Sequence, residues 1–337
     1  MNNWGAVLAL ALSACVIDSD SSPSNRDPEP TARVRSCGPF GCLQNTATGP
    51  DDEVFNELDA SGTFANADGV KIMSFKLRDG TPATLHAKGD RLMAKGASGA
   101  LHLGTELDGS VLVLSKHDVP AFEAKFSVDT VGVAFWGGDT SETVEVYDIQ
   151  VRKFGISDAK PACRDNLPNM DEWPGNPHAA VVFEGDRFHH EAHTVSDSVG
   201  SPWFNIACAG GYPAKLHLLR HTWAGGFSKL DGVQYWPTTL AQRQTYLRAI
   251  TADYHGDGAA HTLSGVPLFY GDAAGIHPMA SGGTIEAIWK ENGAVCLNEP
   301  RVVTRTSIES RGIPIPRCHG VVNWFEMGYV LTVVPPP

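Results

Sequence analysis

The chain has 337 residues, of which 42% are hydrophobic, and it carries a formal net charge of −12 at pH 7. This length predicts two domains, and the apolar fraction is ample for their cores. The acidic balance argues against nucleic acid and anionic lipid headgroups as partners, because both require basic patches. The sequence contains no phosphate loop, dinucleotide fingerprint or Gly-x-Ser-x-Gly motif, so we expect no cofactor.

The first 30 residues have the features of an export signal followed by a tether. The apolar run 5–12 is too short to span a bilayer, and Leu-Ser-Ala then precedes Cys15. Small residues before a cysteine are typical of a bacterial lipobox, so we expect cleavage after residue 14 and a lipid on Cys15. The alternative is an ordinary secretory peptide. Residues 15–50 begin with a Ser-, Asp- and Pro-rich stretch, which predicts a flexible tether.

These features predict an exported, lipid-anchored protein of the cell envelope, at the outer membrane or cell surface. Its partners would be the membrane, through the lipid, and an envelope protein or a glycan. Once the lipid-bearing cysteine is set aside, six of the seven cysteines remain. An even number in an exported chain predicts disulfides. We favour three pairs: Cys37–Cys42, Cys163–Cys208 and Cys296–Cys318.

Residues 51–155 are predicted to form a β-rich domain. Alternating or β-branched runs are separated by Asp-Gly turns, and no helical periodicity is visible. The clearest runs are 70–77, 110–114 and 143–147, and the turns lie at 68–69, 79–80 and 108–109. We expect a small antiparallel sandwich or barrel without clustered ionisable residues, and hence a packing or binding role.

Residues 156–337 are predicted to form an α+β domain with two helices packed on an antiparallel sheet. The first helix is expected from Ala214 to His221, and the second starts at an N-cap, Thr239, with a capping box to Gln242 and stops at Gly256. Strands are expected at 283–289, 293–297, 301–305, 321–325 and 329–334.

Four clustered residues raise the question of a metal site: His189, His190, Glu191 and His193. Imidazole and carboxylate are ligands for zinc and copper. The spacing is His-Glu-x-His without helical pattern, whereas zincin chemistry needs His-Glu-x-x-His on a helix. We therefore favour a solvated polar strand or loop and predict no metal there.

Four ordered motifs carry a resemblance to a known family. They are Tyr147–Val151 running on to Cys163, Phe204–Lys215, Gly256–Thr262 and Trp289–Cys296, and Ala252-Asp253-Tyr254-His255 stands directly before the third. Over residues 147–301 the chain resembles the ADYC domain, an uncharacterised bacterial family named for an Ala-Asp-Tyr-Cys motif. Family members commonly carry cysteines where Leu216 and His255 stand here. The resemblance therefore implies a family disulfide that apolar packing around Leu216 and Tyr246 has replaced. It implies no activity.

The expected function is a binding or interaction module. The alternative is a hydrolase in which Cys208 is the nucleophile, because a thiol where a strand meets a helix can have a lowered pKa. His261 or His255 would act as the base, with Asp253 or Asp257 orienting it. A Cys/His pair without a family signature is weak evidence, so the binding module is favoured over the enzyme.

Overall fold

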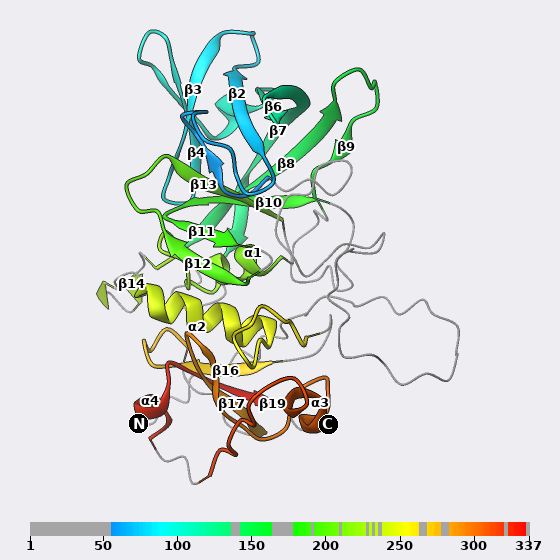
Figure 1. Ribbon diagram of the computed structural model, residues 1–337. Coiled ribbons are helices and arrows are strands. Elements are labelled where there is room, and N and C mark those ends of the chain that lie inside the picture. The colour runs from blue at the N-terminus through cyan, green and yellow to red at the C-terminus, as the bar shows by residue number, and fades with distance from the viewer. Residues whose placement is uncertain are drawn as a thin grey trace.

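The computed structural model describes residues 55–135, 142–163, 178–189, 192–208, 211–226, 229–230, 233–234, 238–262, 268–277, 283–319 and 323–334. The described chain is arranged in three layers (Figure 1). A large curved antiparallel sheet is followed by the helices α1 and α2, and then by a sheet of four strands. This is the α+β class that the sequence predicts. The large sheet ends in two edge strands, so it is not a closed barrel.

The large sheet runs in the order β1-β13-β10-β8-β7-β6-β2-β3-β4-β5, with β9 beside β8. Its strands are β1 Leu58–Asp59, β2 Val70–Lys76, β3 Pro82–Lys88, β4 Arg91–Gly96, β5 Leu101–Leu103, β6 Val111–Lys116, β7 Val119–Ala134, β8 Thr143–Lys153, β9 Lys160–Pro161, β10 Ala179–Glu184 and β13 Trp203–Cys208. A 3-10 helix, η2 Gly104–Leu107, precedes β6. Because β10 pairs with β8, and β13 with both β10 and β1, this sheet crosses the domain boundary expected near residue 155.

Strand β10 lies between two hydrophobic cores and contributes side chains to both. Its first five residues are all apolar and buried. Successive side chains of a strand point to opposite faces, so Ala180 and Val182 enter the core inside the curved sheet. Val181 and Phe183 enter the core shared with α1, α2 and the small sheet. An unbroken apolar run is the pattern expected of a strand that is covered on both faces.

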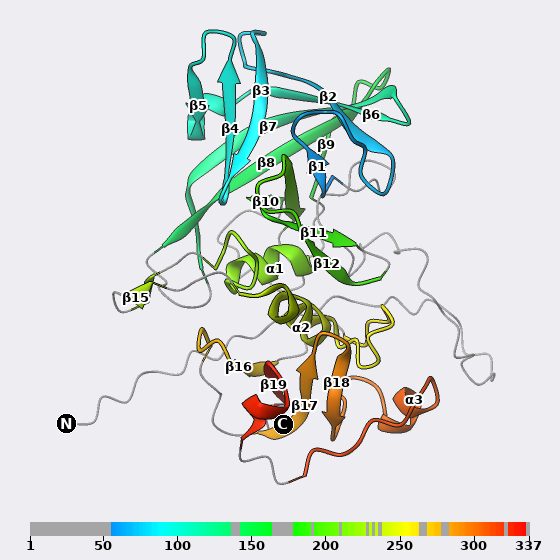
Figure 2. The ribbon, with the colours of Figure 1, turned by 60° about the vertical axis from the view of Figure 1, so that its left-hand side comes forward.

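The middle layer consists of α1 Tyr212–Leu218 and α2 Leu240–Thr251, which lie between the two sheets in Figures 1 and 2. The predicted capping box of α2 is present, since Thr239 Oγ1 accepts from the Gln242 amide at 3.2 Å. The helix stops earlier than expected, because Ala252 takes the left-handed conformation with a φ of 53°. No helix among the described residues is both long and apolar enough to cross a bilayer.

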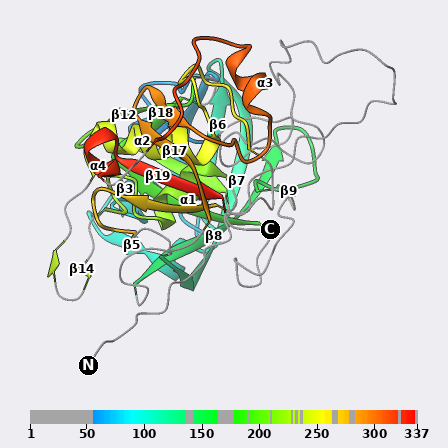
Figure 3. The same cartoon turned by 90° about the horizontal axis from the view of Figure 1, so that it is seen from below.

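The small sheet has the order β16-β19-β17-β18, and Figure 3 shows it lying over α2. Its strands are β16 Phe269–Asp272, β17 Thr284–Lys290, β18 Gly293–Leu297 and β19 Val330–Val334. The remaining elements are the pairs β11 Asp186–His189 with β12 Thr194–Asp197 and β14 Lys229–Leu230 with β15 Val233–Gln234, and the short helices α3 Arg305–Glu309 and α4 Trp324–Met327.

Two predicted strands in this region are wrong. Residues 301–305 form a loop that enters α3, because the Thr304 side chain caps the Ser307 amide at 3.2 Å. An ion pair of 2.7 Å between Arg305 and Glu309, one turn apart, supports the same helix. Of the second predicted strand, 321–325, the structure describes residues 323–325, and Trp324 and Phe325 lie in α4.

Two of the three predicted disulfides lie within the described residues, and both are confirmed. Cys163–Cys208 joins the segment after β9 to the end of β13, with a Cα–Cα distance of 5.3 Å. Cys296–Cys318 ties β18 to the segment after α3, with a Cα–Cα distance of 5.0 Å. The predicted pair Cys37–Cys42 and the lipidation site Cys15 lie outside the described residues.

Replacing Cys163 and Cys208 together by alanine should lower the free energy of unfolding by about 2–4 kcal/mol. The bond closes a loop of 45 residues and so restricts the unfolded chain. Urea denaturation of the two proteins measures the difference. The matched control is the double alanine variant of Cys296 and Cys318, whose shorter separation of 22 residues predicts a smaller loss. An unchanged midpoint, or a free Cys208 thiol in the unreduced folded protein, would contradict the expectation.

Candidate metal centre

His221 lies in the turn that follows α1. The helix ends at Leu218, and Arg220 takes a left-handed conformation with a φ of 62°, which turns the chain sharply. The Arg220 guanidinium is buried, lies 3.7 Å from the centre of the Phe135 ring and donates to Glu142 at 2.6 Å. His221 itself is only 1% exposed. The turn therefore places an imidazole inside the core.

Asp272 and His277 come from a short turn that closes on itself after β16. The Asp272 carboxylate accepts from the backbone amides of Ile276 at 3.1 Å and His277 at 2.6 Å. The Asp272 amide donates in return to the His277 carbonyl at 3.1 Å. Gly275 permits the bend with a φ of 76°. The turn holds a carboxylate and an imidazole next to each other.

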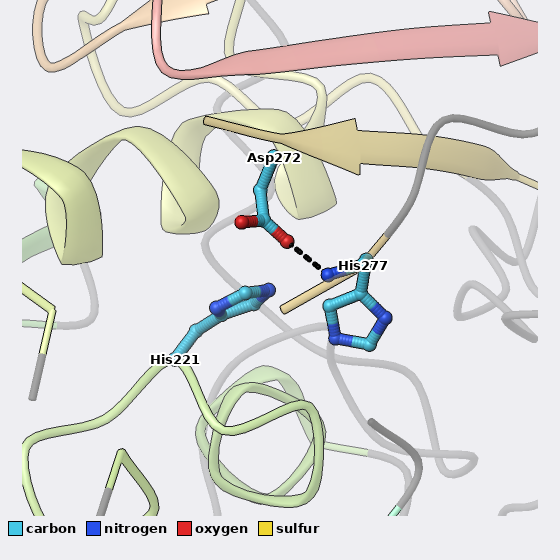
Figure 4. Close-up of side chains that lie close together, drawn as sticks. All are labelled: His221, Asp272 and His277. Atoms are coloured by element: carbon cyan, nitrogen blue, oxygen red, sulfur yellow. Dashed lines mark hydrogen bonds between the residues drawn. The ribbon is translucent and has the colours of Figure 1, made fainter. Parts of the chain in front are cut away.

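The three side chains converge from both sides of the core, as Figure 4 shows. One ligand atom of each residue lies within 4.8 Å of the other two. Asp272 and His277 are 6% and 8% exposed. Among the residues that the structure describes, this is the one group of three histidine, cysteine or carboxylate side chains that meets in this way.

The hydrogen bond of the His277 ring determines which of its two nitrogens is unprotonated. Its Nε2 lies 3.0 Å from the Leu219 carbonyl oxygen, at the end of α1. A carbonyl oxygen only accepts, so Nε2 carries the proton, and neutral His277 has an unprotonated Nδ1. Metal-binding histidines in proteins are commonly oriented by such a bond from the second nitrogen.

Two tyrosines border the His221 ring. The Tyr270 hydroxyl lies 3.2 Å from His221 Nε2, and the Tyr246 ring stacks on the imidazole with a centroid distance of 3.4 Å. His221 Nδ1 is buried and makes no hydrogen bond with any described residue. The Tyr246 hydroxyl is also buried and interacts with the Asp272 carboxylate. The cluster thus keeps one buried imidazole nitrogen, His221 Nδ1, without a hydrogen-bond partner among the described residues.

Burial shifts the protonation of the cluster toward neutral side chains. It lowers the pKa of His221 well below its usual value, and the neighbouring His277 adds to this effect. Burial also lowers the pKa of His277, against the opposing charge of Asp272. The pKa of Asp272 is raised by burial, while His277 and the amides of the turn oppose this rise. Neutral imidazoles are the form of histidine that binds metals.

The donor set fits a transition-metal ion. Two imidazoles and one carboxylate are ligands typical of Zn²⁺ and of other first-row ions, and a hard ion such as Ca²⁺ would need more oxygens. Ligands of a tetrahedral Zn²⁺ lie about 3.3 Å apart. The widest pair here, at up to 4.8 Å, therefore has to close by about 1.5 Å around an ion.

Sequence reasoning missed all three residues. His221 lies 51 positions before Asp272, so no local motif joins them. A usable signal was the strand-like run that ends in Asp272, with Gly275 and His277 shortly after it, because this pattern marks a tight turn that carries two ligands. The position of His221 opposite that turn depends on how α1 packs against the small sheet.

Of the four clustered residues at positions 189–193, the structure describes two, His189 and His193. His189 is exposed at the end of β11, and its Nδ1 accepts from the Ala192 amide at 3.4 Å. His193 is buried at the start of the following strand, where its carbonyl accepts from Gln244 at 2.8 Å. His190 and Glu191 lie outside the described residues.

Cys208 is bonded to Cys163 and therefore has no thiol to act as a nucleophile. The suggested base His261 makes a contact of 2.9 Å with Arg311, which also bonds Asp257 at 3.2 Å. His255 donates from Nε2 to the Ile308 carbonyl of α3 at 2.9 Å. His261 and Asp257 thus share Arg311, His255 binds α3 and Cys208 is in a disulfide, so the structure assembles no Cys/His catalytic pair among these residues.

The Ala-Asp-Tyr motif joins α2 to the small sheet. After the left-handed Ala252, the buried Asp253 pairs with Arg248 and accepts from the amides of the next turn. The Tyr254 hydroxyl donates to Glu286 at 2.6 Å, and Glu286 also binds Arg301 at 2.8 Å. These contacts give Asp253 and Tyr254 a structural role. The proposed replacement of a family disulfide near Leu216 and Tyr246 stays a prediction, and the His255 ring faces α3.

The family model of the ADYC domain matches residues 104–303, which is more than half of the chain. The chain belongs to the ADYC domain family. The match confirms the resemblance seen in the sequence and extends it toward the N-terminus. Searches of curated proteins and of solved structures found no match. All three residues of the metal-site candidate, and the bridge Cys163–Cys208, fall within the matched ADYC region.

Acid should destabilise this ADYC domain protein partly through buried neutral histidines outside the cluster. Burial, together with Arg220, lowers the pKa of His217 to about 3, against 6.5 as the ordinary value. Between these values the unfolded chain binds a proton that the folded protein does not, so stability falls as the pH falls below 6.5. Asp186 acts in the opposite direction, because burial raises its pKa to about 6 despite Arg243.

The contribution of His217 can be isolated with His217→Phe, which keeps an aromatic ring stacked on Phe183. Urea midpoints of both proteins from pH 7 to pH 4 should show a weaker loss on acidification in the variant. The difference between the two free energies of unfolding should change by up to about 1.4 kcal/mol per pH unit. Parallel pH profiles would refute the assignment.

Proposed function

We propose that the protein is an exported, disulfide-stabilised binding module of the cell envelope, and that it binds one transition-metal ion through His221, Asp272 and His277. The observation that carries this proposal is the convergence of two imidazoles and a carboxylate inside the core. The three side chains are almost completely buried, and a buried ionisable group is costly unless it is paired or coordinates a metal.

The orientation of the ligands supports the same function. Leu219 holds the His277 ring by its Nε2, which leaves Nδ1 for an ion, and two backbone amides hold the Asp272 carboxylate. Each carboxylate oxygen has a further lone pair, so these bonds do not prevent coordination. Such orienting contacts are a regular part of protein metal sites.

The cellular location rests on the cysteines. Two disulfides in the described chain fit an oxidising compartment outside the cytoplasm. The lipobox-like sequence before Cys15 supports a lipid anchor, with the acidic, Pro-rich stretch behind it as a spacer. A lipid-anchored chain of this kind would present a folded body at the membrane surface.

The metal site is tested by titrating metal-free, full-length protein with Zn²⁺ in a calorimeter. We expect one ion per chain, and we expect Asp272→Asn and His277→Gln each to weaken binding at least about tenfold, since each removes a ligand. The matched control is His217→Phe, which removes a buried histidine outside the cluster. Absence of Zn²⁺ binding, or equal binding by all variants, would refute the site.

The anchor is tested by Cys15→Ser expressed in a bacterial host that processes lipoproteins. The unchanged protein should sediment with the membrane fraction, whereas the variant should be soluble after a high-salt wash, because the acyl chains supply the attachment. Immunoblots of the two fractions measure the distribution. Membrane retention of the serine variant would show that the attachment has another origin.

A further inference from the structure

The turn after α1 has an arginine at a position where glycine is usual. The helix ends at its C-cap, Leu219. The Arg220 amide then donates to the His217 carbonyl at 2.9 Å. The next amide, that of His221, donates to the Leu216 carbonyl at 2.8 Å. This is the Schellman pattern, in which the residue after the cap is left-handed and most often glycine. Arg220 adopts that conformation with a φ of 62°, although its Cβ disfavours it.

The Arg220 side chain is held by the residues that follow β7 and precede β8. Its guanidinium lies 3.7 Å from the centre of the Phe135 ring and donates to the Glu142 carboxylate at 2.6 Å. The Phe135 amide donates to the Glu142 carbonyl at 3.1 Å, so these two residues are neighbours across the two strands. The Arg220 side chain is 1% exposed and that of Glu142 is 40% exposed. The ion pair therefore leads from the core to the surface.

Both chain neighbours of Arg220 belong to the candidate metal centre. The Leu219 carbonyl accepts the hydrogen bond of 3.0 Å that orients the His277 ring. His221, on the other side, is itself a candidate ligand. The three residues are consecutive, so a displacement of Arg220 shifts one ligand and the anchor of a second ligand at the same time. Removing a contact that orients a metal ligand generally lowers metal affinity about tenfold or more.

We propose that Arg220 is a positioning residue of the metal centre, and that its ion pair with Glu142 sets the affinity of the site for Zn²⁺. This inference rests on the proposed metal-binding function and adds to it a control that lies on the large sheet. Glycine could form the same turn, but it has no side chain that could tie the turn to β7 and β8. A strained residue persists where its surroundings hold it, and here the holding contacts are those of the guanidinium.

Glu142→Ala tests the ion pair and leaves every candidate ligand and Arg220 in place. We expect Zn²⁺ affinity, measured by calorimetry on the metal-free, full-length protein, to fall about two- to thirtyfold. Glu142→Gln should recover part of this loss, because its amide oxygen can still accept from Arg220. The matched control is Glu123→Ala, which removes the partner of Arg152 on the same two strands and should bind Zn²⁺ like the unchanged protein.

A spectrum separates a positioning role from a general loss of stability. Co²⁺ bound in place of Zn²⁺ has visible absorption bands whose position and intensity depend on the coordination geometry. We expect these bands to change in Glu142→Ala, to change less in Glu142→Gln and to stay as they are in Glu123→Ala. A variant that only lowers the free energy of unfolding keeps the spectrum of the unchanged protein. Circular dichroism of the metal-free variants checks that each has folded.

The outcomes separate this inference from the function on which it rests. If Asp272→Asn weakens Zn²⁺ binding but Glu142→Ala keeps the affinity and the Co²⁺ spectrum, the metal site stands and the role of Arg220 is refuted. Equal losses in Glu142→Ala and Glu123→Ala would also refute it, because the effect would then belong to the two strands in general. If the unchanged protein binds no Zn²⁺, or Asp272→Asn binds it equally well, the proposed metal site fails and this inference fails with it.

Discussion

The structure depends on the burial of helix α2 between two sheets. Because the helix is covered on both sides, each of its buried charged side chains needs a partner of opposite charge. Arg243 pairs with Asp186 at 2.8 Å next to the large sheet, and Arg248 pairs with Asp253 just beyond the helix end. All four side chains are almost completely buried. Removing one partner of such a pair generally costs about 3–5 kcal/mol, because the other charge remains buried. These pairs fix the position of α2 and thereby the spacing of the layers.

The same constraint explains the family motif and the candidate metal centre. Asp253 and Tyr254 supply buried acceptors and donors where α2 meets the small sheet, and Glu286 with Arg301 completes this network. The cluster around His221 lies in the same interlayer core, and the neighbouring Arg220 is paired with Glu142. A metal ion would do for these side chains what arginine does for Asp253, and the neutral imidazoles and the inward carboxylate suit that role. We infer that charge pairing and metal binding are two solutions to one packing problem.

The sequence predicted the elements that local chemistry determines. The Thr239 capping box, the Asp-Gly turns between strands and the pairs Cys163–Cys208 and Cys296–Cys318 follow from residues whose preferences act over short distances or from the cysteine count. The strand expected at residues 301–305 failed because the Thr304 hydroxyl caps a helix, which outweighs the β preference of two valines. Local rules cannot rank such competing options without tertiary contacts.

Two larger features could not be read from the sequence. The boundary expected near residue 155 divides a single sheet, because the pairing of β8 with β10 depends on contacts between segments far apart in the chain. The metal-site candidate likewise joins His221 to a turn 51 residues later, and α2 and strands of two sheets lie between them in the chain. The histidines near residue 190 drew notice only because they are close together in the sequence. The spacing of residues in the sequence reveals a site when one helix, strand or turn carries all its ligands. It does not reveal a site whose ligands come from distant segments that the fold brings together.

Anomalous X-ray diffraction can locate the ion that we propose between His221, Asp272 and His277. Crystals of the protein grown with Zn²⁺ should be measured on both sides of the zinc absorption edge. We predict one strong anomalous peak at bonding distance from all three side chains. Density that shows the three side chains bonded only to one another, with zinc absent or bound elsewhere, would contradict it.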